Sequence, residues 1–121
     1  MSTSLDLTTF KALSFDCYGT LIDWEAGISA VLVPWAAEQD LALGEEDLLL
    51  AYADNEAAVE REAPTALYPE VLAEAFRHTG AMLGAPVSDQ WAARLGGSVP
   101  DWPAFPDSAD ALARLARHYQ L

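Results

Sequence analysis

Asp16 is the residue in this sequence that is best suited to carry out chemistry. It ends the mostly apolar run Phe10–Asp16, and Gly19 follows three residues later. A carboxylate with an ordinary pKa of about 3.9 is ionised at neutral pH and can attack carbon or phosphorus to form an ester intermediate. Gly19 supplies the backbone freedom that a tight turn beside such a carboxylate requires. Asp16 is therefore a candidate catalytic nucleophile.

The residues around Asp16 resemble the first motif of the haloacid dehalogenase (HAD) superfamily of hydrolases. The segment reads Phe15-Asp16-Cys17-Tyr18-Gly19-Thr20-Leu21-Ile22-Asp23. In phosphatases of that superfamily the third motif position is a second Asp, which protonates the leaving alkoxide. Here that position holds Tyr18. Because a halide needs no proton to leave, the motif is similar to that of the 2-haloacid dehalogenase (type II) branch.

This resemblance implies hydrolysis of the carbon–halide bond of a small anionic 2-haloacid through a covalent ester on Asp16. It further implies that Tyr18, Cys17, Gly19 and Thr20 form the substrate-binding loop. We expect no metal and no cofactor, because the second Asp that would bind magnesium is absent. Two alternatives remain open: a Mg-dependent phosphatase relative, and a non-catalytic helical interaction module that a partner chain completes.

The same residues also have plainer interpretations. Asp16 could cap a loop, and Tyr18 and Thr20 could serve only in packing and turn formation. Cys17 is expected to be a small buried residue rather than a thiol catalyst, because neither histidine lies near it in sequence.

The apolar run before Asp16 predicts the element that positions it. Phe10–Asp16 has the length and composition of a buried strand. The resemblance implies an α/β fold, a HAD-like Rossmann core with an inserted α-helical cap. Residues 1–16 and 99–121 would form a partial core with only the first strand and one later helix. Residues 17–98 would be loop plus helical cap, so that the chain as a whole is mostly α.

Helical periodicity dominates the rest of the chain. We predict four helices before the proline-rich stretch 99–106 and one helix after it. Pro34 should kink or divide the first helix. The second helix should begin with the acidic residues after Gly44. Pro69 should lie in the first turn of the third helix, and Ser88 or Asp89 should begin the fourth helix. The predicted buried residues are Ile28, Val31, Leu32, Trp35, Ala36, Leu48, Leu49, Tyr52, Ala53, Val59, Val71, Leu72, Ala75, Phe76, Leu112, Leu115 and Tyr119.

Several groups that the superfamily uses are expected to be missing. Its later Ser/Thr, Lys and acidic motifs would follow a second strand that should begin near Leu121. The only lysine, Lys11, would lie roughly 16 Å from Asp16 along an extended strand. No basic residue occurs between Lys11 and Arg61. We therefore expect this chain to be incomplete and inactive alone, with its single strand paired by a second copy or a complementing chain.

The charge and composition exclude some classes of partner. With 19 acidic and 6 basic residues, the net charge of −13 disfavours nucleic acid and anionic membranes. The single cysteine rules out an internal disulfide. We find no signal peptide and no apolar stretch of the roughly 20 residues needed to span a bilayer. The sequence therefore predicts a cytoplasmic protein with a small-molecule substrate.

Overall fold

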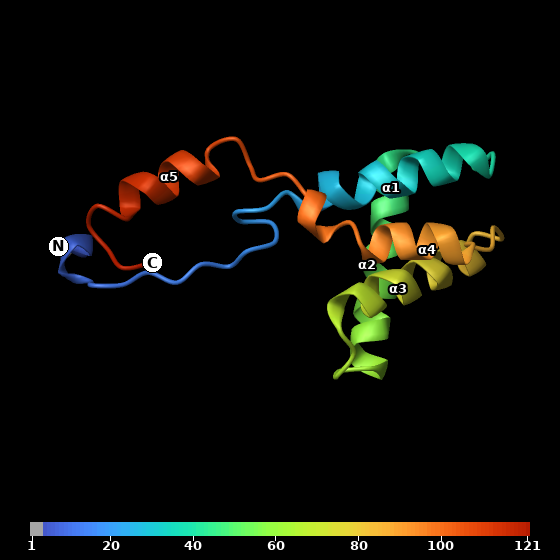
Figure 1. Cartoon of the computed structure of the whole chain (residues 1–121), viewed down its shortest axis with the longest axis horizontal. Coiled ribbons are helices and arrows are strands. Elements are labelled where there is room, and N and C mark those ends of the chain that lie inside the picture. The colour runs from blue at the N-terminus through green and yellow to red at the C-terminus, as the bar shows by residue number, and fades with distance from the viewer. Residues whose placement is uncertain (1–3) are drawn as a thin grey trace. The chain divides into compact units, whose positions relative to one another are not determined.

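A computed structural model describes residues 4–121 of the chain. It divides into two compact units (Figure 1). The first, which we call the terminal unit, comprises Met1–Asp23 and Pro103–Leu121. The second, the helical unit, comprises Trp24–Trp102. The chain passes between the units at two places, Asp23–Trp24 and Trp102–Pro103.

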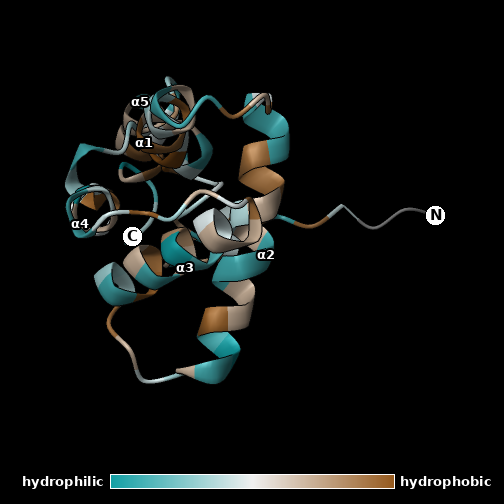
Figure 2. Cartoon of the chain, turned by 90° about the vertical axis from the view of Figure 1, so that its right-hand side faces the viewer, coloured by the Kyte–Doolittle hydropathy of each residue, from teal (hydrophilic) through white to brown (hydrophobic). Residues whose placement is uncertain are grey.

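The helical unit is a bundle of four α-helices. These are α1 (Trp24–Glu38), α2 (Glu45–Glu62), α3 (Tyr68–Met82) and α4 (Asp89–Gly96). Helix α3 packs against α2 and α4, and α1 also packs against both of those helices. A short 3-10 turn, Val99–Asp101, follows α4. Figure 2 shows hydrophobic and hydrophilic residues interspersed along α2, as expected of a helix with one buried side.

The predicted helices of this unit are present, with ends close to the expected residues. Gly44 is the N-cap of α2, and three acidic residues occupy its first turn. Pro69 lies in the first turn of α3, and the Ser88 hydroxyl accepts a hydrogen bond from the Trp91 amide at the start of α4. Helix α1 continues through Pro34 rather than dividing there.

The hydrophobic core of the described residues lies in the helical unit. Its largest fully buried side chains include Trp35, Tyr52 and Phe76, and the Trp35 and Phe76 rings meet edge to face at 5.0 Å. Most of the predicted core residues are buried, although Leu49 and Ala53 are only half-buried. Burial of such side chains contributes about 1.5–3 kcal/mol each, so this core stabilises the bundle.

The terminal unit contains α5 (Ser108–Leu115) and a 3-10 turn, Leu7–Thr9. Its predicted inward residues Leu112, Leu115 and Tyr119 are half-buried rather than buried. Every buried hydrophobic residue in the described part of the chain belongs to the other unit. The terminal unit therefore has little apolar burial of its own.

The predicted α/β fold is wrong. Residues 4–121 contain five α-helices and no β-strand, only isolated bridges. The segment Phe10–Asp16 is not a buried strand, because Phe10 and Phe15 are 49% and 38% exposed. Among the described residues, the β-bridge partner of this segment is Gln120: the Leu13 amide donates to the Gln120 carbonyl, and the Gln120 amide donates to the Lys11 carbonyl, both at 2.9 Å.

The predicted strand is wrong because an apolar run indicates only that a segment tends to be buried. A strand also needs neighbours that complete its hydrogen bonds and cover its faces. Within the described residues, one parallel bridge, Ala12 with Gln120, is the only pairing of this run. The chain is thus a helical bundle with an appended terminal unit and not a Rossmann core.

Candidate functional site

Asp16 begins a tight turn that backbone hydrogen bonds hold together. The Cys17 carbonyl accepts hydrogen bonds from the amides of Thr20, Leu21 and Ile22 at 3.2, 2.8 and 3.0 Å. The Gly19 amide donates back to the Ile22 carbonyl at 2.9 Å. Gly19 has a φ of +88°, a conformation that side chains disfavour, so glycine is required at this position. We call residues Asp16–Ile22 the Asp16 turn.

The Asp16 turn is anchored to the segment that precedes α5. The amides of Asp23 and Phe105 donate to the carbonyls of Pro103 and Leu21 at 2.8 and 3.1 Å. The buried Ser108 hydroxyl, at the start of α5, also donates to the Leu21 carbonyl at 2.8 Å. Residues 80 or more positions apart in sequence thereby fix the turn within the terminal unit.

The Asp16 carboxylate and the Thr20 hydroxyl are brought together by this turn. The Thr20 hydroxyl donates to Oδ2 of Asp16 at 3.0 Å. Asp16 itself is exposed, so the carboxylate is open to solvent and to small molecules. A hydrogen bond to one oxygen restricts the rotation of the carboxylate, which favours one orientation for attack by the other oxygen.

The remaining predicted site residues lie on the same turn. Tyr18 is 42% exposed. Cys17 is exposed, so the expectation that it is a small buried residue is wrong; all of residues 16–20 are exposed, because the turn has no apolar side chains packed over it. An exposed thiol next to the candidate nucleophile can itself react with electrophiles.

A separate hollow of about 590 Å³ lies in the helical unit, at the N-terminal ends of α1 and α2. Its apolar lining includes Trp24, Leu49 and Leu50. Its acidic lining consists of Glu25, Glu45 and Glu46. These carboxylates repel an anionic substrate, so the hollow does not suit a 2-haloacid.

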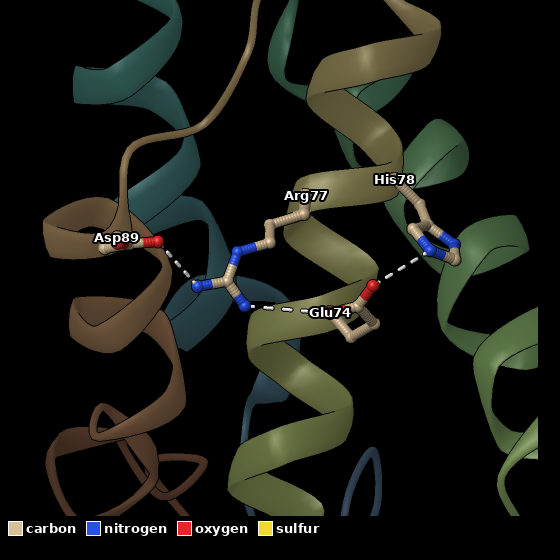
Figure 3. A network of polar contacts seen from close by, with 4 residues as sticks. All are labelled: Glu74, Arg77, His78 and Asp89. Carbon is tan, nitrogen blue, oxygen red and sulfur yellow. Dashed lines mark hydrogen bonds and ion pairs between the residues drawn. The ribbon is translucent and has the colours of Figure 1, made fainter.

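A polar network on the surface of α3 is unrelated to the Asp16 turn. Figure 3 shows Glu74 between Arg77 and His78, with Arg77 reaching across to Asp89. The Arg77–Asp89 pair measures 3.0 Å, and the His78–Glu74 pair 3.1 Å. These side chains are substantially exposed, and such pairs contribute about 0–1 kcal/mol each. The network links α3 to the start of α4.

Sequence reasoning missed a cluster at the junction of α2 and α3. The hydroxyls of Tyr52 and Tyr68 both donate to Oε1 of Glu56, at 3.2 and 3.0 Å. Tyr52 and Glu56 are four residues apart on α2, and this spacing was the available signal. Tyr68 could not be assigned to the pair from spacing because it belongs to the next helix.

Within residues 4–121, no three His, Cys, Asp or Glu side chains gather closely enough to hold a metal ion. In the same residues, no helix is long and apolar enough to cross a membrane. Models of known protein families do not match the chain, and no curated protein sequence matches it either.

Proposed function

We propose that Asp16 is the nucleophile of a hydrolase related to the haloacid dehalogenases, acting on the carbon–halogen bond of a small 2-haloacid. The hydrogen bond between Thr20 and Asp16 is the observation that carries this proposal. A carboxylate nucleophile must be accessible and oriented. Asp16 is exposed, its Oδ2 is held by Thr20, and we assign the attack to Oδ1.

The proposed reaction has two steps. In the first, Oδ1 of Asp16 attacks the carbon that bears the halogen, and the halide leaves with the bonding electron pair. This step forms an ester between Asp16 and the acid. In the second, water adds to the ester carbonyl, and collapse releases a 2-hydroxy acid, one proton and the original carboxylate.

The charge of the chain limits this reaction. An anionic substrate approaching Asp16 meets a like charge on a chain of net charge −13. Among the described residues, none of the ion pairs includes Asp16. We therefore propose that the chain alone turns over slowly or not at all, and that a second copy or a complementing chain provides the cation that balances the site.

Covalent capture tests the nucleophile without requiring turnover. The protein would be incubated with excess 2-bromopropionate, and the modified residue would be located by peptide mass mapping. Because the neighbouring exposed thiol can also be alkylated, the experiment uses Cys17→Ser as the background. We expect an adduct on Asp16 that hydroxylamine removes, since hydroxylamine cleaves esters and leaves thioethers intact.

The matched control is Asp16→Asn in the same Cys17→Ser background, with Asp6→Asn as a second exposed carboxylate of the terminal unit. We expect Asp16→Asn to abolish the hydroxylamine-sensitive adduct and Asp6→Asn to leave it unchanged. Absence of an adduct on Asp16, or equal labelling in the Asp16→Asn protein, would refute the proposed role.

A second candidate function is a non-catalytic interaction module. The exposure of Phe10 and Phe15 in a unit with little apolar burial favours this alternative. Sedimentation equilibrium of the 121-residue chain would test it. We expect a concentration-dependent dimer if a second copy covers these rings, and a strictly monomeric protein would argue against self-association.

A further inference from the structure

A hollow at the end of α5 collects basic side chains in an otherwise acidic chain (Figure 1). It has a volume of about 430 Å³. Two of the six basic residues of the chain and one of its two histidines line it, together with two apolar side chains. These five residues, which we call the α5 hollow, are Ala111, Arg114, Leu115, Arg117 and His118. The reaction proposed for Asp16 uses none of them.

The local backbone keeps the three nitrogen-bearing side chains of the α5 hollow together. Arg117 and His118 follow Arg114 by three and four residues, the spacing of neighbours on one helical face. Helix α5 ends at Leu115, but the chain keeps turning. The Arg117 amide donates to the Arg114 carbonyl at 3.3 Å, and the His118 amide donates to the Leu115 carbonyl at 3.0 Å. These hydrogen bonds hold the backbone that carries the three side chains.

The α5 hollow uses few of its hydrogen-bond donors in ion pairs. Arg114, Arg117 and His118 are exposed. Arg114 pairs with Asp110 through Nε at 3.4 Å, and this pair is weak because the two side chains are 68% and 78% exposed. Among the described residues, the ion pairs include neither Arg117 nor His118. The guanidinium and imidazole groups can therefore bind an anion from solution.

The negative charge of the chain is concentrated in the helical unit. The terminal unit holds five of the 19 acidic residues and three of the six basic residues. Its side chains thus carry a formal net charge of −2, compared with −13 for the whole chain. At physiological ionic strength, exposed charges more than about 8 Å apart are largely screened from one another. An anion at the α5 hollow is therefore governed mainly by the cations that line it.

We propose that the α5 hollow binds a phosphate monoester that carries a small apolar group. Two guanidinium groups provide two positive charges, and a phosphate monoester carries about −1.5 to −2 at neutral pH. The forked donors of Arg114 and Arg117 match pairs of phosphate oxygens, and the imidazole of His118 offers an N–H donor even when it is neutral. A carboxylate has one oxygen and one charge fewer. The half-buried Ala111 and Leu115 contact the apolar group.

Titration of the full chain with phenyl phosphate tests this site. NMR would follow the side-chain N–H groups of Arg114 and Arg117 and the imidazole of His118. We expect saturable shifts in all three, with a dissociation constant on the order of 1 mM, as for a few exposed charge-assisted hydrogen bonds. Inorganic phosphate should bind several-fold more weakly because it lacks the ring, and benzoate should also bind several-fold more weakly because it lacks the third oxygen. Absence of saturable shifts, or equal affinity for either of these probes and phenyl phosphate, would overturn the proposal.

Two arginine variants separate the α5 hollow from general effects of charge. Arg117→Gln removes one forked donor and should weaken phenyl phosphate binding about tenfold or more. Arg94→Gln makes the same change of charge in the helical unit, at an arginine that lies over the Trp91 ring at 4.4 Å. This variant should bind as the wild type does. Equal weakening in the two variants would show that binding depends only on net charge and would overturn the site.

A variant that gains affinity keeps the test decisive if Arg117→Gln fails to fold. Asp110→Asn removes the carboxylate that competes for Arg114, so it should strengthen phenyl phosphate binding several-fold. Asp107→Asn makes the same change of charge at the N-cap of α5 and should strengthen binding less, because the described ion pairs do not include Asp107. No gain in Asp110→Asn, or an equal gain in Asp107→Asn, would contradict the assignment.

Discussion

The indole of Trp102 lies against the α-carbon of Gly27 so closely that no room remains for a side chain at residue 27. Trp102 is 6% exposed, and its Nε1 donates to the Ser98 hydroxyl at 2.9 Å. The two residues are close to the two points where the chain enters and leaves the helical unit. Their contact therefore ties the beginning of α1 to the end of that unit.

Gly27→Ala should destabilise the helical unit. Alanine normally stabilises a helix by about 1 kcal/mol relative to glycine, but a methyl group here collides with the Trp102 ring. We expect a net loss of about 1–3 kcal/mol in the free energy of unfolding, measured by urea denaturation. Gly44→Ala, where the added methyl meets nothing within 4 Å, should cost less than about 1 kcal/mol. A stabilised Gly27→Ala protein would contradict the contact.

Replacing Phe76 or Phe15 with alanine should lower the free energy of unfolding by different amounts, because only the Phe76 ring is in the core. Phe76 is fully buried in α3, whereas Phe15 is 38% exposed in the terminal unit. We expect Phe76→Ala to lower the free energy of unfolding by about 3–5 kcal/mol and Phe15→Ala by less than about 1 kcal/mol. Thermal and urea unfolding of both variants would measure this difference, and equal costs would contradict the location of the core.

Ionisation of Tyr52 should destabilise the protein in alkaline solution. Burial, together with the charge of Glu56, raises the pKa of Tyr52 above its ordinary value of 10.0. A group whose pKa is raised on folding contributes stability below its unfolded pKa, and that stability is lost as pH rises above it. The free energy of unfolding should therefore fall above about pH 10 in the wild type.

Tyr52→Phe supplies the control for this alkaline transition because it keeps the buried ring and removes the ionisable hydroxyl. Its free energy of unfolding should decline less between neutral pH and pH 11 than that of the wild type. Indistinguishable alkaline profiles of Tyr52→Phe and the wild type would mean that Tyr52 ionises in the folded protein as readily as in the unfolded chain.

Loss of the Thr20 hydroxyl should reduce the reactivity of Asp16 without unfolding the protein. Thr20→Val keeps the shape of the side chain but cannot donate to Oδ2 of Asp16. Because the contact is exposed, we expect a stability change below about 1 kcal/mol. The rate of ester formation with 2-bromopropionate should fall several-fold, and Thr20→Ser should restore it. The same labelling rate in the wild type, Thr20→Val and Thr20→Ser would contradict the proposal that Thr20 orients Asp16.

The helices of the helical unit could be predicted because their signals are local. Apolar residues three and four positions apart define one face of α1, and Ile28, Leu32 and Trp35 are indeed fully buried there. Pro69 and Ser88 act on the turns in which they occur, through a missing amide and a capping hydroxyl. None of these effects depends on a distant part of the chain.

The wrong prediction of a strand has the opposite origin. The apolar character of Phe10–Asp16 is a local property, but pairing depends on which other segments reach it. Within residues 4–121 the structure gives this run one bridge, that of Ala12 with Gln120, so most of the run stays exposed. The role of the Asp16 turn as a catalytic site remains a prediction, although its conformation follows from Gly19 and from hydrogen bonds to residues near α5.

The sequence by itself indicated where the second, third and fourth helices of Trp24–Trp102 begin and which faces of the helices are apolar, because those features arise from interactions within a few residues. Only the tertiary structure decided that Tyr68 shares an oxygen of Glu56 with Tyr52, that Trp102 covers Gly27, and that Phe15 lacks a buried position. These contacts join residues far apart in the chain, and no local spacing specifies which distant side chains will meet.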